Sequence, residues 1–75
     1  MGSSIMKEFI SNQVYNERVT LNLTQEELAQ KLGVSRQTII AIEKGHYTPS
    51  VLLALKISEV FSKSVEDIFS IKYEK

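Results

Sequence analysis

Residues 24–45 read TQEELAQKLGVSRQTIIAIEKG, a stretch that contains the start and stop signals of two short helices. Thr24 and Glu27 have the spacing of a capping box, in which each side chain satisfies a backbone amide at the helix start. Gly33 ends this helix, because glycine adopts the left-handed conformation without a Cβ penalty. A second helix begins two residues later and ends at Gly45. The stretch therefore predicts a helix-turn-helix unit.

Each of the two helices has apolar residues at the spacing of a single buried face. In the first helix the apolar residues follow an i, i+1, i+4 pattern. In the second helix, which begins at Ser35, two isoleucines lie three residues apart. The positions expected to face inward are Leu28, Ala29, Leu32, Ile39 and Ile42.

Three more helices are predicted outside this unit. Asn12 is suited to cap a first helix that carries Val14 and Leu21, and Asn22 is suited to end it in the left-handed conformation. Ser50 opens a fourth, strongly apolar helix, and Ser64 caps a short fifth one. The order of start and stop signals thus indicates five short helices.

The C-terminal tail has the alternation of a strand. Phe69, Ile71 and Tyr73 lie on one side, with serine and lysine between them. Phe9 and Ile10, near the other end of the chain, could supply the pairing partner. We therefore expect an all-α fold of five helices with a short terminal antiparallel β-sheet.

The composition limits the class of protein. The chain has 75 residues, nine Lys+Arg against nine Asp+Glu, and no cysteine. This length fits a single domain, and the zero net charge excludes a globally basic polymer binder but not a local basic surface. The absence of cysteine excludes a disulfide framework and favours a cytoplasmic location. No apolar run approaches the roughly 20 residues that a membrane span needs.

The first residues are typical of a vector-derived extension. Met1-Gly2-Ser3-Ser4 precedes a second methionine, Met6, which is suited to be the native start. We expect residues 1–5 to be such an extension and residues 6–75 to form a single domain, with the helix-turn-helix at about residues 24–44.

The run from Leu23 to Gly45 resembles the helix-turn-helix of the Cro and C1 repressor family, also called the XRE family, and the resemblance extends to Phe69. It is nearest to the minimal stand-alone regulators of the cytolysin-operon repressor type, which add a small β-sheet to the five-helix domain. The resemblance implies a five-helix repressor-like DNA-binding domain. It also implies a sequence-specific transcriptional regulator, with repression as its simplest mode of action.

Helix-turn-helix proteins place the second helix in the major groove, with its N-terminal residues at the base edges. Arg36 can donate two hydrogen bonds to guanine, and Gln37 can pair with adenine. The hydroxyl of Thr38 could reach a base or a phosphate, or bond within its own chain. The predicted base contacts are Arg36, Gln37, Thr38, Ile40 and Ala41.

The resemblance also implies contacts to the DNA backbone, which set register without reading sequence. In the family, the residue matching Gln25 binds a phosphate and supports the base-reading side chain. The residue matching Arg18 pairs with the one matching Glu43 while it faces the DNA backbone. The predicted phosphate contacts are Arg18, Gln25, Lys44, His46, Tyr47 and Thr48.

We expect a homodimer, because a single recognition helix with few cations is too little for tight specific binding. A two-fold dimer would place two recognition helices in successive major grooves, about 34 Å apart, on a palindromic operator. The predicted interface consists of Thr48, Val65, Ile68 and Phe69.

Three residues depart from the family pattern. Glu17 stands where relatives usually have an apolar residue of the first helix, which suggests a helix that is rotated or less deeply packed. Ile40 stands where a small polar residue is common. Leu52 replaces a frequent charge and marks a second contact surface.

Two other functions remain open. One is an antitoxin-type regulator that also binds a toxin protein, and the other is a protein-interaction module without DNA binding, which the neutral charge favours. An enzyme is not expected, because neighbouring acids such as Glu26 and Glu27 point about 100° apart and no nucleophile–base pair can be assembled. His46 has no cysteine or second histidine to complete a metal site. We expect no cofactor, metal or small-molecule ligand.

Overall fold

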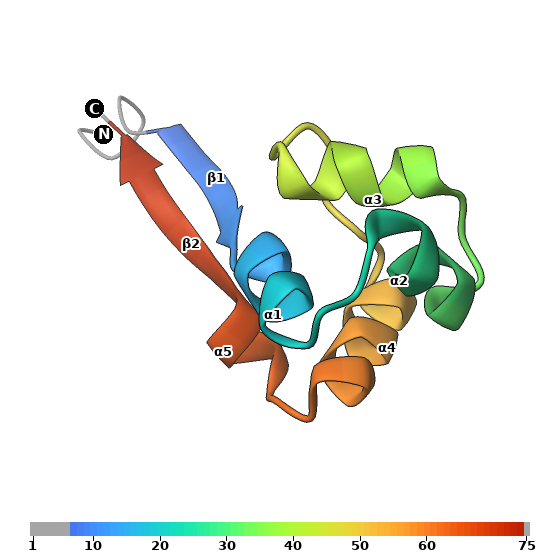
Figure 1. Cartoon of the computed structure of the whole chain (residues 1–75). Coiled ribbons are helices and arrows are strands. Elements are labelled where there is room, and N and C mark those ends of the chain that lie inside the picture. The colour runs from blue at the N-terminus through green and yellow to red at the C-terminus, as the bar shows by residue number, and fades with distance from the viewer. Residues whose placement is uncertain (1–6, 75) are drawn as a thin grey trace.

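The computed structural model describes residues 7–74, which form five helices and a two-stranded antiparallel sheet (Figure 1). The elements are β1 (Lys7–Asn12), α1 (Val14–Thr20), α2 (Gln25–Leu32), α3 (Arg36–Glu43), α4 (Val51–Phe61), α5 (Val65–Ile68) and β2 (Phe69–Glu74). The predicted fold class is confirmed. The extension predicted at residues 1–5 lies outside the described residues.

Helices α2 to α5 each begin at a hydroxyl side chain that accepts a backbone hydrogen bond from the residue three positions on. These N-caps are Thr24, Ser35, Ser50 and Ser64. At α2 the capping box is complete, because Glu27 also accepts the N–H of Thr24 at 2.8 Å. Each of these caps contributes about 1 kcal/mol. Helix α1 differs, because its N-cap is Gln13, whose side chain forms no cap bond. Asn12, which was predicted as the cap, lies one residue earlier and accepts the N–H of Val14 at 3.0 Å.

The turns depend on four residues in the left-handed region of backbone conformation. Three were predicted from the sequence, namely Asn22 (φ 58°), Gly33 (φ 73°) and Gly45 (φ 78°). The fourth, Ser62 (φ 54°), ends α4 and carries no such sequence signal. At Gly33 the chain turns within three residues, so α2 and α3 pack directly against each other.

The core lies between the helices and draws on all five of them. Its members are Val14, Leu28, Ala29, Leu32, Ile39, Ile42, Leu53, Ile57, Phe61 and Ile68. The inward faces predicted for the helix-turn-helix are therefore confirmed. Burial of each large apolar side chain contributes about 1.5–3 kcal/mol, and this small core holds α3 against α2 and α1.

Helix α4 is apolar around much of its circumference, but it buries a single stripe of side chains. Leu53, Ile57 and Phe61 face the core, whereas Val51 and Leu55 are exposed. Although α4 is the longest described helix, with 11 residues, no helix within residues 7–74 is both long and apolar enough to cross a membrane.

The two strands form a ribbon that extends from the helices at one end of the molecule (Figure 1). They pair antiparallel, with Ile10 opposite Ile71 and Asn12 opposite Phe69. The alternation of the tail and its pairing with residues 9–10 are confirmed. The apolar side of the ribbon is not covered by the core, because Ile71 and Tyr73 are exposed.

Because Gly33 and Ser62 both have a positive φ, we predict that glycine is the more stable residue at each of these helix ends. In Gly33→Ala the new Cβ would form an ordinary van der Waals contact, 3.8 Å from Lys56 Nζ, but the residue's φ of 73° should lower the free energy of unfolding by about 1 kcal/mol. Ser62→Gly at φ 54° should raise this free energy by ~0.5 kcal/mol. Urea denaturation measures both effects. Equal stability of Gly33→Ala and the parent chain would contradict the assignment of strain.

Candidate nucleic-acid interface

Helix α3 lies along one edge of the helical body, next to α2 (Figure 1). Its rotation is fixed by Ile39 and Ile42, which are both 0% exposed. On the outward side, Arg36 and Gln37 are exposed. The structure therefore brings the polar residues of the first turn of α3 to the surface.

The other predicted base-contact residues are less accessible. Thr38, Ile40 and Ala41 are each half-buried. The Thr38 hydroxyl lies 3.1 Å from Ser35 Oγ, within the capped first turn. Because a hydroxyl can donate one hydrogen bond and accept two, this contact leaves it further capacity.

A buried ion pair joins α1 to the end of α3. Arg18 Nε donates to Glu43 Oε2 at 2.6 Å, and Arg18 Nη2 donates to Glu43 Oε1 at 3.2 Å. Arg18 Nη1 donates to the carbonyl of Leu23 at 2.9 Å. Its side-chain hydrogen bond with Glu43 raises the pKa of Arg18 and outweighs burial, which acts in the opposite direction. The pair thus holds three segments of the chain together.

Arg18 differs from the other predicted phosphate contacts, because the residue is 9% exposed. Its guanidinium also lies over the ring of Tyr15, 5.2 Å from the ring centroid. With Nε, Nη1 and Nη2 all donating within the chain, the structure places Arg18 in the support of α3 rather than on the open surface.

Gln25 connects the start of α2 to the same carboxylate. Its Nε2 donates to Glu43 Oε1 at 3.1 Å. Next to it, a shallow open depression in the surface is lined by Arg18, Thr24, Gln25, Glu26 and Arg36. The N-terminus of α2 and the first residue of α3 therefore share one surface.

The loop after α3 presents the remaining predicted phosphate contacts at the surface. The exposed residues are Lys44, His46, Tyr47 and Thr48. The N–H of His46 donates to the Ala41 carbonyl at 2.9 Å, which holds the loop against the end of α3. Within residues 7–74, no three His, Asp or Glu side chains gather as a metal site would require.

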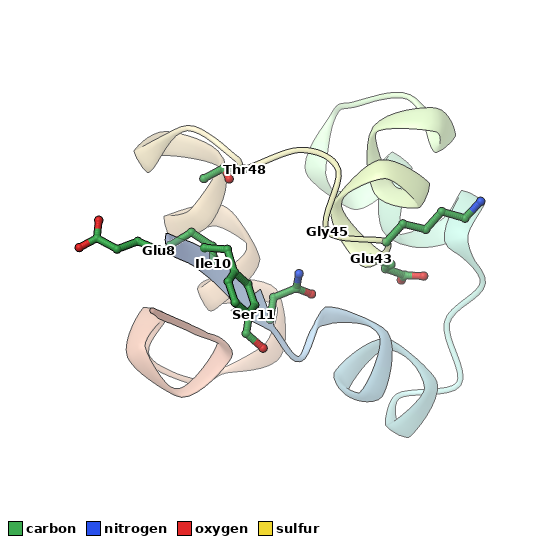
Figure 2. A pocket seen from close by; sticks show the side chains of 9 residues that line it. Glu8, Ile10, Ser11, Glu43, Gly45 and Thr48 are labelled. Atoms are coloured by element: carbon green, nitrogen blue, oxygen red, sulfur yellow. The ribbon is translucent and has the colours of Figure 1, made fainter. Parts of the chain in front are cut away.

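A polar hollow separates this loop from the ribbon. Figure 2 shows β1 residues Glu8, Ile10 and Ser11 across the hollow from the segment that contains Glu43 and Gly45. Thr48 also lines it. The loop and β1 thus lie close together without filling the space between them.

The residues predicted for a dimer interface are not equally accessible. Thr48 is exposed, and Val65 and Phe69 are half-buried. Ile68 is 1% exposed and belongs to the core, so its side chain has almost no surface to offer a partner. An exposed apolar face also lies at the start of α4, where the sequence had indicated a second contact surface at Leu52 alone. This face consists of Val51, Leu52 and Leu55.

Glu17, the departure in α1, has a local explanation. Lys63 Nζ donates to Glu17 Oε2 at 2.8 Å, and this hydrogen bond raises the pKa of Lys63. Val14 on the same helix is fully buried. Helix α1 therefore packs closely, and the acid connects it to the turn after α4.

Two exposed cations remain near α3. Arg36 and Lys44 are exposed, and neither forms an ion pair with another described residue. They lie at opposite ends of the helix. A polyanion would therefore meet positive charge at both ends of α3, although the whole chain is neutral.

The sequence has relatives among known proteins. Residues 14–68 match the protein family described as helix-turn-helix (HTH). The HTH-type transcriptional regulator MJ0272 of Methanocaldococcus jannaschii is 60% identical over 60 residues, which cover 80% of this chain and 91% of that protein. The HTH-type transcriptional regulator YgzD of Bacillus subtilis is 48% identical over 65 residues, or 87% of this chain and 98% of YgzD. The cryptic phage CTXphi transcriptional repressor RstR of Vibrio cholerae is 30% identical over 60 residues, or 80% of this chain and 54% of RstR.

Replacing one partner of the buried ion pair should lower the free energy of unfolding more than replacing both partners. We expect Arg18→Met to lower the free energy of unfolding by about 2–3 kcal/mol, because it leaves the Glu43 carboxylate buried without its cation. Combining Arg18→Met with Glu43→Leu should recover most of this loss. A double-mutant cycle in urea measures the coupling. Additive losses in the double variant would contradict it.

Proposed function

The chain belongs to the Cro/C1-type (XRE) helix-turn-helix family of DNA-binding transcriptional regulators, and from this premise we propose that it is a repressor that binds a palindromic operator as a homodimer. The resemblance inferred from residues 23–45 is confirmed by the family match and by both close relatives. The similarity to RstR, a transcriptional repressor, favours repression over activation. The family consists of DNA-binding regulators rather than enzymes, and the proposed site of action is cytoplasmic DNA.

The observation that carries the proposal is the exposure of Arg36 and Gln37 on a helix whose opposite face is fully buried. Both are at the N-terminal end of α3, which helix-turn-helix proteins present to the base edges. We assign Arg36 to guanine and Gln37 to adenine, with Thr38, Ile40 and Ala41 completing the contact with the groove. The half-buried Ile40 suits a thymine methyl group.

Phosphates are assigned to both ends of α3. At one end, the start of α2 provides backbone N–H groups and Gln25 beside Arg36, an arrangement suited to an anion. At the other end, the loop provides Lys44 and three polar or aromatic neighbours, His46, Tyr47 and Thr48. Arg18 serves this surface indirectly, because it holds Glu43, which in turn holds the Gln25 amide.

A homodimer is supported by charge and by exposed apolar surface. With two unpaired cations beside α3, one subunit releases few counterions, so its nonspecific affinity for DNA is modest. Thr48, Val65 and Phe69 are accessible, as is the face of Val51, Leu52 and Leu55 at the start of α4. Contiguous apolar surface on a domain this small is typical of an interface. We assign the second copy to this side of the molecule.

An antitoxin-type function has one observation in its favour. An apolar depression, lined by Leu21, Leu23, Lys31 and Val60, could bind a different protein. Co-purification of the native chain with a second, different protein would favour this function. A regulator that acts alone would be recovered as one chain.

Selection of bound duplexes from random DNA tests the proposal. We expect a two-fold consensus whose half-sites are separated by about one helical turn. Arg36→Ala should then lose about 1–3 kcal/mol of binding free energy, with preference relaxed at one base position. Lys44→Ala should weaken binding to all DNA sequences by the same factor, and it should reduce the slope of log affinity against log salt concentration by about 1.

Lys31→Ala is the matched control, because Lys31 lies in the last turn of α2 and lines a different depression. Its affinity and salt slope should equal those of the parent chain. Failure to enrich any duplex, or equal affinity of Arg36→Ala and the parent chain for every sequence, would overturn direct readout by α3.

Sedimentation equilibrium tests whether the chain forms a homodimer through the proposed interface. Leu52 is 68% exposed, so Leu52→Lys should leave the fold intact and convert a dimer into a monomer. Leu21→Lys, at a residue 49% exposed in the α1–α2 turn, should leave the dimer unchanged. A parent chain that stays monomeric at micromolar concentration, or a Leu52→Lys dimer, would contradict the proposed interface.

A further inference from the structure

Asn12 makes two hydrogen bonds to distant parts of the fold. Its Oδ1 accepts the N–H of Val14 at 3.0 Å, where α1 begins. Its Nδ2 donates to the carbonyl of Ile42 at 3.0 Å, a residue 30 positions away in the recognition helix. One side chain therefore joins the end of β1, the start of α1 and the last turn of α3.

The Ile42 carbonyl is available because it belongs to the last turn of α3, where carbonyls have no partner within the helix. It also accepts the N–H of Gly45 at 3.0 Å, so both of its lone pairs are used. Among the described residues, the bond from Asn12 is the one hydrogen bond between the sheet and α3. The polar hollow of Figure 2 separates β1 from the segment just beyond this contact.

Asn12 also lies next to the proposed dimer surface. Asn12 pairs with Phe69, the first residue of β2, across the sheet. The next residue, Gln13, donates its N–H to the carbonyl of Ile68, the last residue of α5, at 2.8 Å. A continuous path thus runs from Phe69 through Asn12 to Ile42.

We propose that Asn12 is a positioning residue that fixes the angle between α3 and the β-ribbon, and through it the spacing of the two recognition helices in the dimer. The effect on spacing rests on the proposed function. In a dimer with recognition helices about 34 Å apart, each helix lies roughly 17 Å from the two-fold axis. A change of about 10° in the angle of α3 would move the recognition helix about 3 Å, which is nearly one base-pair step.

Two variants separate this role from helix capping. Asn12→Ser keeps an oxygen that can accept the Val14 N–H, but its side chain is too short to reach the Ile42 carbonyl. Asn12→Asp keeps the acceptor and removes the donor. The control is Asn16→Ala, which removes a 2.7 Å hydrogen bond from Asn16 Nδ2 to Gln13 Oε1 on the exposed side of α1. This bond does not connect α1 to another helix or strand. Thermal unfolding of each variant establishes that it is folded.

The first measurement needs no DNA. The chain has no cysteine, so spin labels can be placed at Gln37→Cys in α3 and Lys72→Cys in β2, two exposed positions. Labelled chains are diluted with unlabelled chains so that distances within one subunit dominate. Asn12→Ser and Asn12→Asp should broaden or shift the distance distribution, because both remove the hydrogen bond that joins Asn12 to α3. Distributions that match those of the parent chain and Asn16→Ala would overturn the role of Asn12.

The second measurement compares DNA spacings. On the optimal two-half-site duplex, Asn12→Ser should lose about 3- to 10-fold in affinity, the value of one hydrogen bond, and should lose its preference among duplexes with one base pair inserted or deleted. Its affinity for a single half-site should match that of Asn16→Ala. Equal losses on single half-sites and at every spacing would overturn the proposal. If the parent chain binds no duplex, the proposed function fails, and the label distances still decide whether Asn12 positions α3.

Discussion

The burial of Ile39 and Ile42 is the constraint on which the site depends. Because both side chains are 0% exposed, α3 cannot rotate without opening the core, and its opposite face must meet solvent. The cost of exposing two isoleucines is several kcal/mol, a large part of the stability of a domain this small. The backbone that carries Arg36 and Gln37 is therefore held in place in the free protein, so binding of DNA has a small entropic cost for ordering this helix.

Electrostatics complete what apolar packing leaves undetermined. Apolar contacts set the rotation of α3, and a charged centre ties its C-terminal end to two other helices. The Glu43 carboxylate receives Arg18 from α1 and Gln25 from α2, so three helices share one charged centre. Its buried charge is neutralised within the chain, which leaves the exposed cations at the two ends of α3 to act on an external polyanion.

The sequence predicts most of the fold because its decisive signals are local. A capping serine and the amide it satisfies are three residues apart, and a glycine at a turn needs no distant partner. Helix α4 shows the limit: it is apolar on most faces, so periodicity cannot determine that Leu53 is buried and Leu52 exposed. That choice is made by the packing of α2 and α5. Ile68 was assigned to an interface for the same reason, although the core already encloses it.

The site was predicted less completely than the fold. Exposure of Arg36 and Gln37 follows from the position of the two inward isoleucines, which the sequence reveals. The pairing of Arg18 with Glu43, which the family resemblance implied, is confirmed. The bonds from Arg18 to the Leu23 carbonyl and from Gln25 to Glu43 do not follow from the sequence, because they depend on how the three helices pack. Asn12 was predicted as a cap, but its bond to a carbonyl 30 residues away depends on tertiary structure alone.

The central claim is that the outward face of α3 enters the major groove. The most direct test is an NMR titration of the isotope-labelled chain with a selected two-fold duplex, following each backbone amide. We expect the largest shift changes at residues 36–41 and at Lys44, with β2 residues 71–74 unaffected by direct contact. Changes concentrated in the α1–α2 turn or the ribbon, with residues 36–41 unmoved, would contradict the account.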